Sequence, residues 1–139
     1  MLNRWIGSGR LTKDPELKKT YNGLDIATFK IAVDRDGKPG DENKKTDFIK
    51  VVAWGKIAEF VGKYFTKGSL VIVEGRLHIR SYIDEEGTKR SATEIVADRV
   101  HFGESKKASM ARNESSVEAD SNGSEKDYYD YDPTDYADF

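Results

Sequence analysis

The chain has 139 residues, with 23 Lys and Arg against 25 Asp and Glu, which gives a formal net charge of −2. This length suits one ordinary domain, and the 37% hydrophobic fraction with twelve glycines is typical of a chain with a folded core. The absence of cysteine excludes disulfides, thiolate nucleophiles and cysteine-ligated zinc or iron–sulfur clusters. No apolar run reaches the roughly 18 residues of a membrane helix, and no leader pattern opens the chain. We expect a soluble cytoplasmic protein without a membrane partner.

The charges are distributed unevenly along the chain. Residues 1–102 carry a net charge of +4, whereas residues 103–139 carry −6 and contain no Leu, Ile or Trp. A segment of this composition cannot bury enough apolar surface to offset its chain entropy. The sequence therefore predicts a folded domain over residues 1–102 and a disordered acidic tail over residues 103–139. The end of the tail, residues 127–139, alternates carboxylates with aromatic rings.

Apolar and polar residues alternate with period two in the first part of the chain, which is typical of β-strands. The predicted strands cover residues 4–11, 24–33, 46–54, 70–82 and 91–102. Between the third and fourth strands, Ile57, Phe60, Val61 and Tyr64 have helical spacing, and Gly68 is expected near the end of that helix. Five strands with one short helix in this place match the OB-fold, a five-stranded Greek-key barrel. We therefore expect an all-β fold of this class, which alone does not decide function.

The third and fourth predicted strands each have an aliphatic and a mixed face. The aliphatic faces, expected to fill the barrel, carry Ile49, Val51 and Ala53, and Val71, Val73, Leu77 and Ile79. The opposite faces carry Phe48, Lys50, Val52 and Trp54, and Arg76, His78, Arg80 and Tyr82. Single-stranded nucleic acid requires such a pairing of rings on which bases stack with cations that follow the phosphates. Because stacking tolerates any base, we expect binding that is independent of sequence.

Two ordinary explanations compete with this interpretation. Phe, Trp and Tyr are also common core residues, and a face of this kind also suits contact between subunits. Each further surface cation is, by itself, more often solvated than bound to phosphate; these are Lys44, Lys45, Lys56, Lys63, Lys67, Lys89 and Arg90. Lys50, His78 and Arg80 in the middle of the mixed face favour nucleic acid, because a second core face would not normally carry them.

Signs of catalysis are weak in this sequence. The two histidines, His78 and His101, belong to no recognisable triad, and no phosphate-binding loop is present. The acids of the tail lack the central Gly and terminal Glu of a calcium loop. We expect no enzymatic activity, no metal and no cofactor. A metal-dependent nuclease, and an OB module that binds RNA or protein, are the alternatives.

A series of motifs in chain order resembles the bacterial and phage single-stranded-DNA-binding protein family. The motifs cover residues 1–4, 9–17, 22–23, 27–33, 47–48, 54–56, 67–69 and 74–77. The resemblance extends over about residues 1–102 and implies an OB-fold that assembles as a homotetramer. It also implies that the protein coats single-stranded DNA in replication, recombination and repair, in the cytoplasm at the nucleoid. An acidic C-terminal tip would recruit replication and repair proteins.

The resemblance also implies roles for individual residues. Phe48, Trp54 and Tyr82 fall where the family has base-stacking aromatics, and Lys50, Lys56, Lys67 and Arg80 fall at or beside its basic DNA contacts; His78 and Arg4 complete the expected DNA-binding set. The expected partner-binding tip consists of Asp135, Tyr136, Asp138 and Phe139.

The sequence departs from the family pattern in three places. Asp138 stands where the family tip has Pro, and residues 34–47 lack an aromatic that some members carry. Gly7 and Ser8 stand where aliphatic residues are usual in the first strand. The last departure predicts a weaker first strand or a changed subunit contact.

Overall fold

The computed structural model describes residues 1–40, 42–105, 107–108 and 111. In this part of the chain the elements are β1 (Trp5–Leu11), β2 (Glu16–Lys19), β3 (Asp25–Asp34), β4 (Thr46–Trp54), α1 (Lys56–Tyr64), β5 (Leu70–Ile83) and β6 (Lys89–Phe102). Residues Met1–Glu104 form one compact unit. Nearly all of the predicted acidic tail, with its tip, lies outside the described residues. Within those residues, no helix has the length and apolar character needed to cross a membrane.

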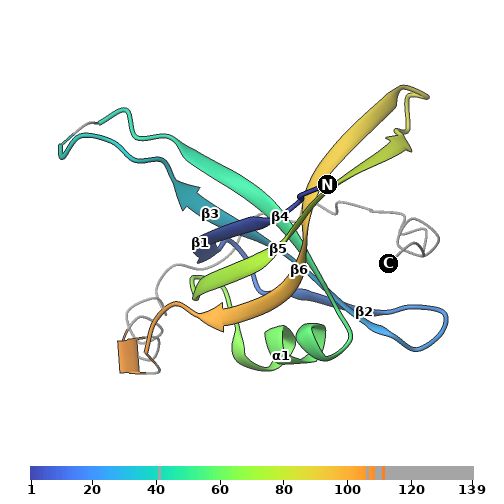
Figure 1. The fold of residues 1–139 in the computed structure, drawn as a ribbon, viewed down its shortest axis with the longest axis horizontal. Coiled ribbons are helices and arrows are strands. Elements are labelled where there is room, and N and C mark those ends of the chain that lie inside the picture. The colour runs from blue at the N-terminus through green and yellow to red at the C-terminus, as the bar shows by residue number, and fades with distance from the viewer. Residues whose placement is uncertain (41, 106, 109–110, 112–139) are drawn as a thin grey trace. The chain divides into compact units, whose positions relative to one another are not determined.

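The strands form one sheet that closes on itself. Their order is β1-β5-β6-β4-β3-β2, and β1 also pairs with β3 through Arg10↔Ala32 and Leu11↔Ile31. The β4–β6 pairing is parallel, and the other pairings are antiparallel. A sheet closed by its first strand is a barrel, and α1 lies between β4 and β5 in the chain, at one end of the barrel (Figure 1). The OB-fold expected from the sequence is therefore confirmed.

The interior of the barrel is filled by side chains of one parity from β1, β3, β4, β5 and β6. The buried cluster contains Leu11, Ala27, Phe29, Ile31, Val51, Ala53, Val71, Val73, Ile95 and Ala97 from the strands, with Ala58, Val61 and Phe65 from α1 and its C-terminal end. Burying a large aliphatic side chain contributes about 1.5–3 kcal/mol, so this cluster is the main stabilising feature of the domain.

The helix ends earlier than the glycine signal suggests. Tyr64 is its last residue, and the N–H of Phe65 in the C-cap position donates to the carbonyl of Val61 at 3.0 Å. Gly68 has φ 85° and lies in the turn that leads into β5. Its left-handed backbone conformation therefore serves that turn and not the helix end.

Two hairpins, β3–β4 and β5–β6, extend beyond the barrel and diverge (Figure 1). The β5–β6 pairing continues to Ile83↔Lys89. Leu77 and Ile79, expected to fill the barrel with Val71 and Val73, are instead 42% and 62% exposed. That expectation was wrong, because this stretch of β5 runs beyond the strands that enclose the interior. The resulting hairpin carries exposed apolar side chains on the side of β5 opposite Arg76, His78 and Arg80.

The glycines of β1 lie where a side chain would collide with a neighbour. A Cβ atom on Gly7 would lie 2.4 Å from the ring of Trp5, and one on Gly9 would lie 2.6 Å from the carbonyl oxygen of Ala32. The indole of Trp5 thus occupies the space that an aliphatic residue at position 7 would fill. β1 nevertheless pairs with β5 from Trp5↔Gly75 to Arg10↔Leu70.

Candidate nucleic-acid interface

One face of the sheet carries the side chains of β3, β4, β6 and β5 whose parity is opposite to that of the barrel-filling cluster; we call it the binding face. Strand pairing arranges these side chains in rows across the sheet. One row is Thr28, Val52, Val96 and Arg76, and the next is Lys30, Lys50, Glu94 and His78. Beyond this row the β4–β6 pairing ends: Phe48 pairs with Ala32 in the β3–β4 hairpin, Arg80 pairs with Ala92 in the β5–β6 hairpin, and Tyr82 lies beyond Arg80 on β5.

Aromatic rings lie at three positions on the binding face. Phe48 is 65% exposed and Tyr82 is 37% exposed, whereas Trp54 is half-buried at the far end of β4. At roughly 3.3 Å per residue, Phe48 and Trp54 lie about 20 Å apart along the strand, which gives room for several bases. The guanidinium of Arg80 lies 5.7 Å from the centre of the Tyr82 ring. The face therefore presents separate ring surfaces on which unpaired bases can stack.

A buried group of charges occupies the centre of the binding face. The carboxylate of Glu94 is fully buried; its Oε2 lies 3.4 Å from Nζ of Lys50, and its Oε1 lies 3.4 Å from Nδ1 of His78 and 4.0 Å from Nε of Arg80. Lys50 is 8% exposed and Arg80 is 6% exposed. Burial lowers the pKa of the Lys50 ammonium, and the charge of Glu94 opposes that shift. Lys50 and Arg80 therefore lie on the binding face, as the parity predicted, but both side chains are buried in it.

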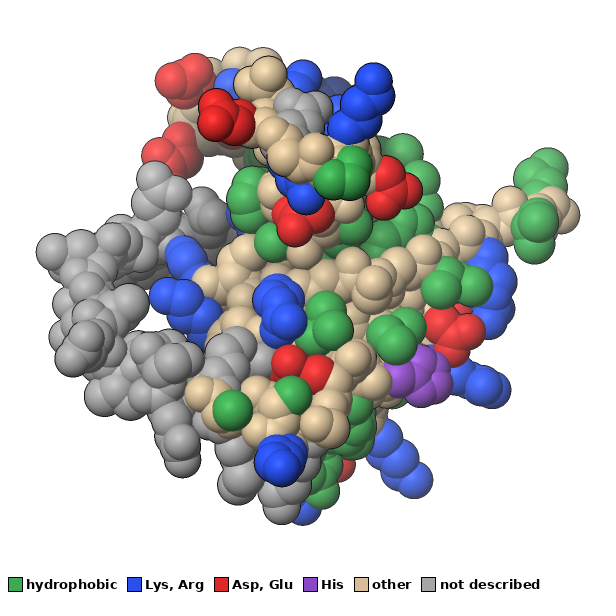
Figure 2. All heavy atoms as spheres, turned by 90° about the vertical axis from the view of Figure 1, so that its left-hand side faces the viewer, with side chains coloured by type: hydrophobic (Ala, Val, Ile, Leu, Met, Phe, Trp, Pro, Cys, Tyr) green, Lys and Arg blue, Asp and Glu red, His purple; other side chains and the backbone are tan. Residues whose placement is uncertain are grey.

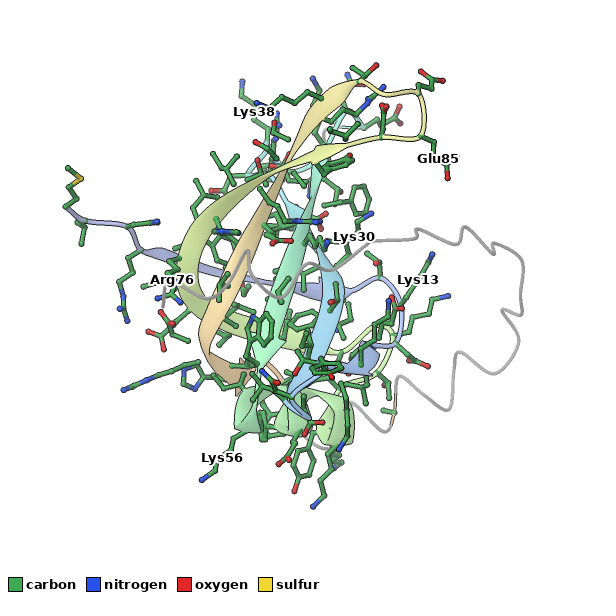
Figure 3. All side chains as sticks on the ribbon, turned by 90° about the vertical axis from the view of Figure 1, so that its right-hand side faces the viewer. Lys13, Lys30, Lys38, Lys56, Arg76 and Glu85 are labelled. Carbon is green, nitrogen blue, oxygen red and sulfur yellow. The ribbon has the colours of Figure 1, made fainter. Side chains whose placement is uncertain are left out.

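The other expected cations lie outside these rows. Lys56 is the first residue of α1 and is exposed, and Figure 3 shows it at the helix end of the barrel, away from Lys30. Lys67 is exposed in the turn between α1 and β5, where its backbone N–H donates to Oδ1 of Asp14 at 2.7 Å. Arg4 precedes β1 and pairs with Glu74 at 3.6 Å. The structure thus places the three aromatics on the same strand faces as Lys50, His78 and Arg80, and leaves Arg4, Lys56 and Lys67 elsewhere around the barrel.

Three members of the binding face were not in the expected DNA-binding set: Lys30, Arg76 and Glu94, although the sequence had placed Arg76 on the mixed face of the fourth predicted strand. Lys30 is exposed and pairs directly with Lys50 across β3 and β4, and Arg76 is half-buried on β5. The alternation of residues along β3 and β5 puts Lys30 and Arg76 on the same side as the expected site, and this pattern could have identified both cations. Glu94 directly precedes the apolar run 95–97 on β6, and a charged residue beside a buried run usually has a specific partner.

Charged side chains of both signs lie on the face of the molecule that Figure 2 shows. Figure 2 shows basic side chains interspersed with acidic and apolar ones on one side.

Among the residues with described positions, no group of three or more His, Asp and Glu side chains is arranged to hold a metal ion.

Comparison with known proteins agrees with this geometry. The Single-strand binding protein family model matches residues 2–103. Single-stranded DNA-binding protein 2 of Staphylococcus aureus strain COL is 50% identical over 106 residues, which is 76% of each chain. Single-stranded DNA-binding protein 1 of S. aureus strain MSSA476 is 46% identical over 76% of this chain and 68% of its own, and Single-stranded DNA-binding protein 3 of Listeria innocua is 48% identical over 76% and 66%. The family model matches nearly the whole OB barrel, including its mixed aromatic and basic face. The chain therefore belongs to the single-strand binding protein family.

Proposed function

We propose that the protein binds single-stranded DNA independently of base sequence, through the binding face. The observation that carries this proposal is the placement of Phe48, Trp54 and Tyr82 on one face with basic side chains between them. Membership of the family and the names of the relatives support it. The proposed DNA-binding residues are these three rings with Lys50, His78 and Arg80, and the outlying Arg4, Lys56 and Lys67.

The proposed cellular role is to coat and protect single-stranded DNA in replication, recombination and repair, in the cytoplasm at the nucleoid. This role is one of binding and not of catalysis.

A mobility-shift assay tests the proposed function directly. Labelled oligothymidine, an RNA oligomer and a duplex of equal length are each titrated with the full chain, with and without Mg²⁺. The proposal expects the single-stranded DNA to shift at the lowest protein concentration and to stay intact. Equal affinity for RNA would favour an RNA-binding module, and loss of the label with Mg²⁺ would favour a nuclease.

Self-assembly as a homotetramer is part of the proposal. Exposed apolar side chains support it: Ile6 on β1 is 62% exposed, and Ile79 and Ile83 on β5 are 62% and 74% exposed. A second subunit would remove these side chains from water. Sedimentation equilibrium should show an oligomer, and a monomer at micromolar concentration would contradict this part.

Partner recruitment is assigned to the C-terminal tip, Asp135, Tyr136, Asp138 and Phe139, which lies outside the described residues. The support is chemical, because alternating carboxylates and aromatics suit a basic, apolar pocket on another protein. Deleting residues 137–139 should abolish the capture of replication and repair proteins while DNA binding stays equal or becomes tighter. A marked loss of DNA binding would refute this division of roles.

A further inference from the structure

Glu94 occupies a central place on the binding face, and the proposed stacking does not use it. β6 lies between β4 and β5, and Glu94 pairs in register with Lys50 on one side and His78 on the other. Its side chain is fully buried, although a lone buried carboxylate is costly. The three cationic or titratable groups around it, Lys50, His78 and Arg80, lie within 4.0 Å of its oxygens.

The cations on and beside the Glu94 row differ in their exposure, and therefore in their accessibility to a phosphate. Lys50 and Arg80, in contact with the carboxylate, are nearly buried, and the Arg80 guanidinium also lies against the Tyr82 ring. Lys30, directly opposite Lys50 in the same row, is exposed. It projects from the middle of the sheet in Figure 3. One row of the sheet therefore contains an accessible cation beside one that is engaged with a carboxylate.

We propose that Glu94 is an internal counter-ion that withholds Lys50 and Arg80 from DNA phosphates, so that these two residues of the proposed site support the binding face without neutralising phosphate. The inference rests on the proposed DNA-binding function. Phosphate contacts then come from exposed cations, of which Lys30 lies in the same row of the sheet. Glu94 acts on DNA only through the two cations and is a positioning residue.

The salt dependence of binding reports how many cations contact phosphates. For single strands, the slope of log K against log salt changes by roughly 0.7 for each phosphate neutralised. If Glu94 withholds two cations, removing its charge frees them to bind phosphates. The slope then becomes steeper and low-salt affinity rises. A purely structural role for Glu94 would lower stability without changing the slope.

The test compares Glu94→Gln with Glu59→Gln, which removes the same charge from an exposed position on α1. Oligothymidine affinity is measured over a range of salt concentrations. We expect the slope of Glu94→Gln to exceed the parent slope by about 0.7–1.4, for one or two released cations, and that of Glu59→Gln to match the parent. Equal slopes for the two variants would overturn the inference.

A second pair of variants keeps the test decisive if Glu94→Gln does not fold. Lys50→Met should leave the parent slope unchanged, whereas Lys30→Met should reduce it by about 0.7. A reduction in Lys50→Met equal to that in Lys30→Met would show that Lys50 contacts phosphate, and would overturn the inference.

A measurement without DNA separates this inference from the proposed function. Amine labelling of the free protein, read by mass spectrometry, should modify Lys50 more slowly than Lys30, and Glu94→Gln should speed the labelling of Lys50. Equal rates at Lys50 and Lys30 in the parent protein would overturn the role of Glu94 even if no nucleic acid binds. Failure of the parent to bind oligothymidine, with slow labelling at Lys50, would instead overturn the proposed function alone.

Discussion

Phe48 is the most exposed ring of the binding face, so its removal should affect DNA more than the fold. Stacking is worth about 1–3 kcal/mol per base, so Phe48→Ala should lower affinity for oligothymidine by roughly 5- to 150-fold. Tyr21→Ala is the control, because Tyr21 is 99% exposed in the turn after β2 and outside the proposed contacts. Fluorescence anisotropy with a labelled oligomer measures both. Equal affinity of the two variants would remove Phe48 from the site.

Asp84 at the end of the β5–β6 hairpin provides a test of the electrostatics. A hydrogen bond from Arg90, and then one from the backbone N–H of Thr88, hold the pKa of Asp84 below its ordinary value. Because the folded pKa lies below the unfolded one, the associated stability is present above about pH 4 and is lost as pH falls through the folded pKa.

Arg90→Gln should therefore raise the pKa of Asp84 toward that of a free carboxyl group, as NMR titration would show. The internal control is Asp47, whose pKa is lowered by Arg35 and should stay low in the same variant. An unchanged pKa for Asp84 would contradict the role of Arg90.

At the scale of elements, the β5–β6 pairing depends on one glycine. The register passes from Glu74↔Arg99 to Gly75↔Ala97, so β6 has one extra residue, Asp98, at a bulge. A Cβ atom on Gly75 would lie 2.1 Å from the carbonyl oxygen of Val96, and that backbone atom cannot move without disturbing the ladder. The close approach explains why the residue at this position has no side chain.

Gly75→Ala should lower the free energy of unfolding by about 1–3 kcal/mol or more, as overpacking does. Gly37→Ala is the matched control, because its new Cβ atom would meet nothing closer than Lys44 at 3.7 Å. Urea denaturation followed by circular dichroism compares the two. Equal stability of the two variants would contradict the backbone clash.

The long strands and the helix could be predicted because each buries one regular face. β4 matches its predicted range, β1, β5 and β6 differ from theirs by one or two residues at one end, and β3 differs by one residue at each end. β2 could not be found this way, because all four residues of Glu16–Lys19 are exposed and only pairing with β3 defines the strand. Parity assigned Leu77 and Ile79 to the correct side of β5, but parity does not report where the barrel ends.

For the candidate site, the sequence predicted which side chains share a face but not which of them are buried. Alternation placed Phe48, Lys50 and Trp54 on one side of β4, and His78, Arg80 and Tyr82 on one side of β5. The burial of Lys50 and Arg80 depends on Glu94, which comes close only through the β4–β6 and β5–β6 registers. Such contacts between distant segments leave no local pattern in the sequence.

At the scale of the whole molecule, the chain separates a barrel with a net positive charge from an acidic C-terminal segment. The central claim concerns the barrel: unpaired bases stack on the rings of the binding face. Trp54 reports on that face, whereas Trp5 lies over Gly7 on β1 and would add signal of its own. The Trp5→Phe variant isolates the fluorescence of Trp54.

The most direct measurement is a fluorescence titration of this variant with oligothymidine and with a duplex of equal length, at two salt concentrations. We predict that only the single strand quenches Trp54, that quenching saturates at a fixed ratio of nucleotides to protomer, and that higher salt weakens binding. Absence of quenching, together with no binding in a mobility-shift assay, would contradict the account and assign the rings to subunit contact.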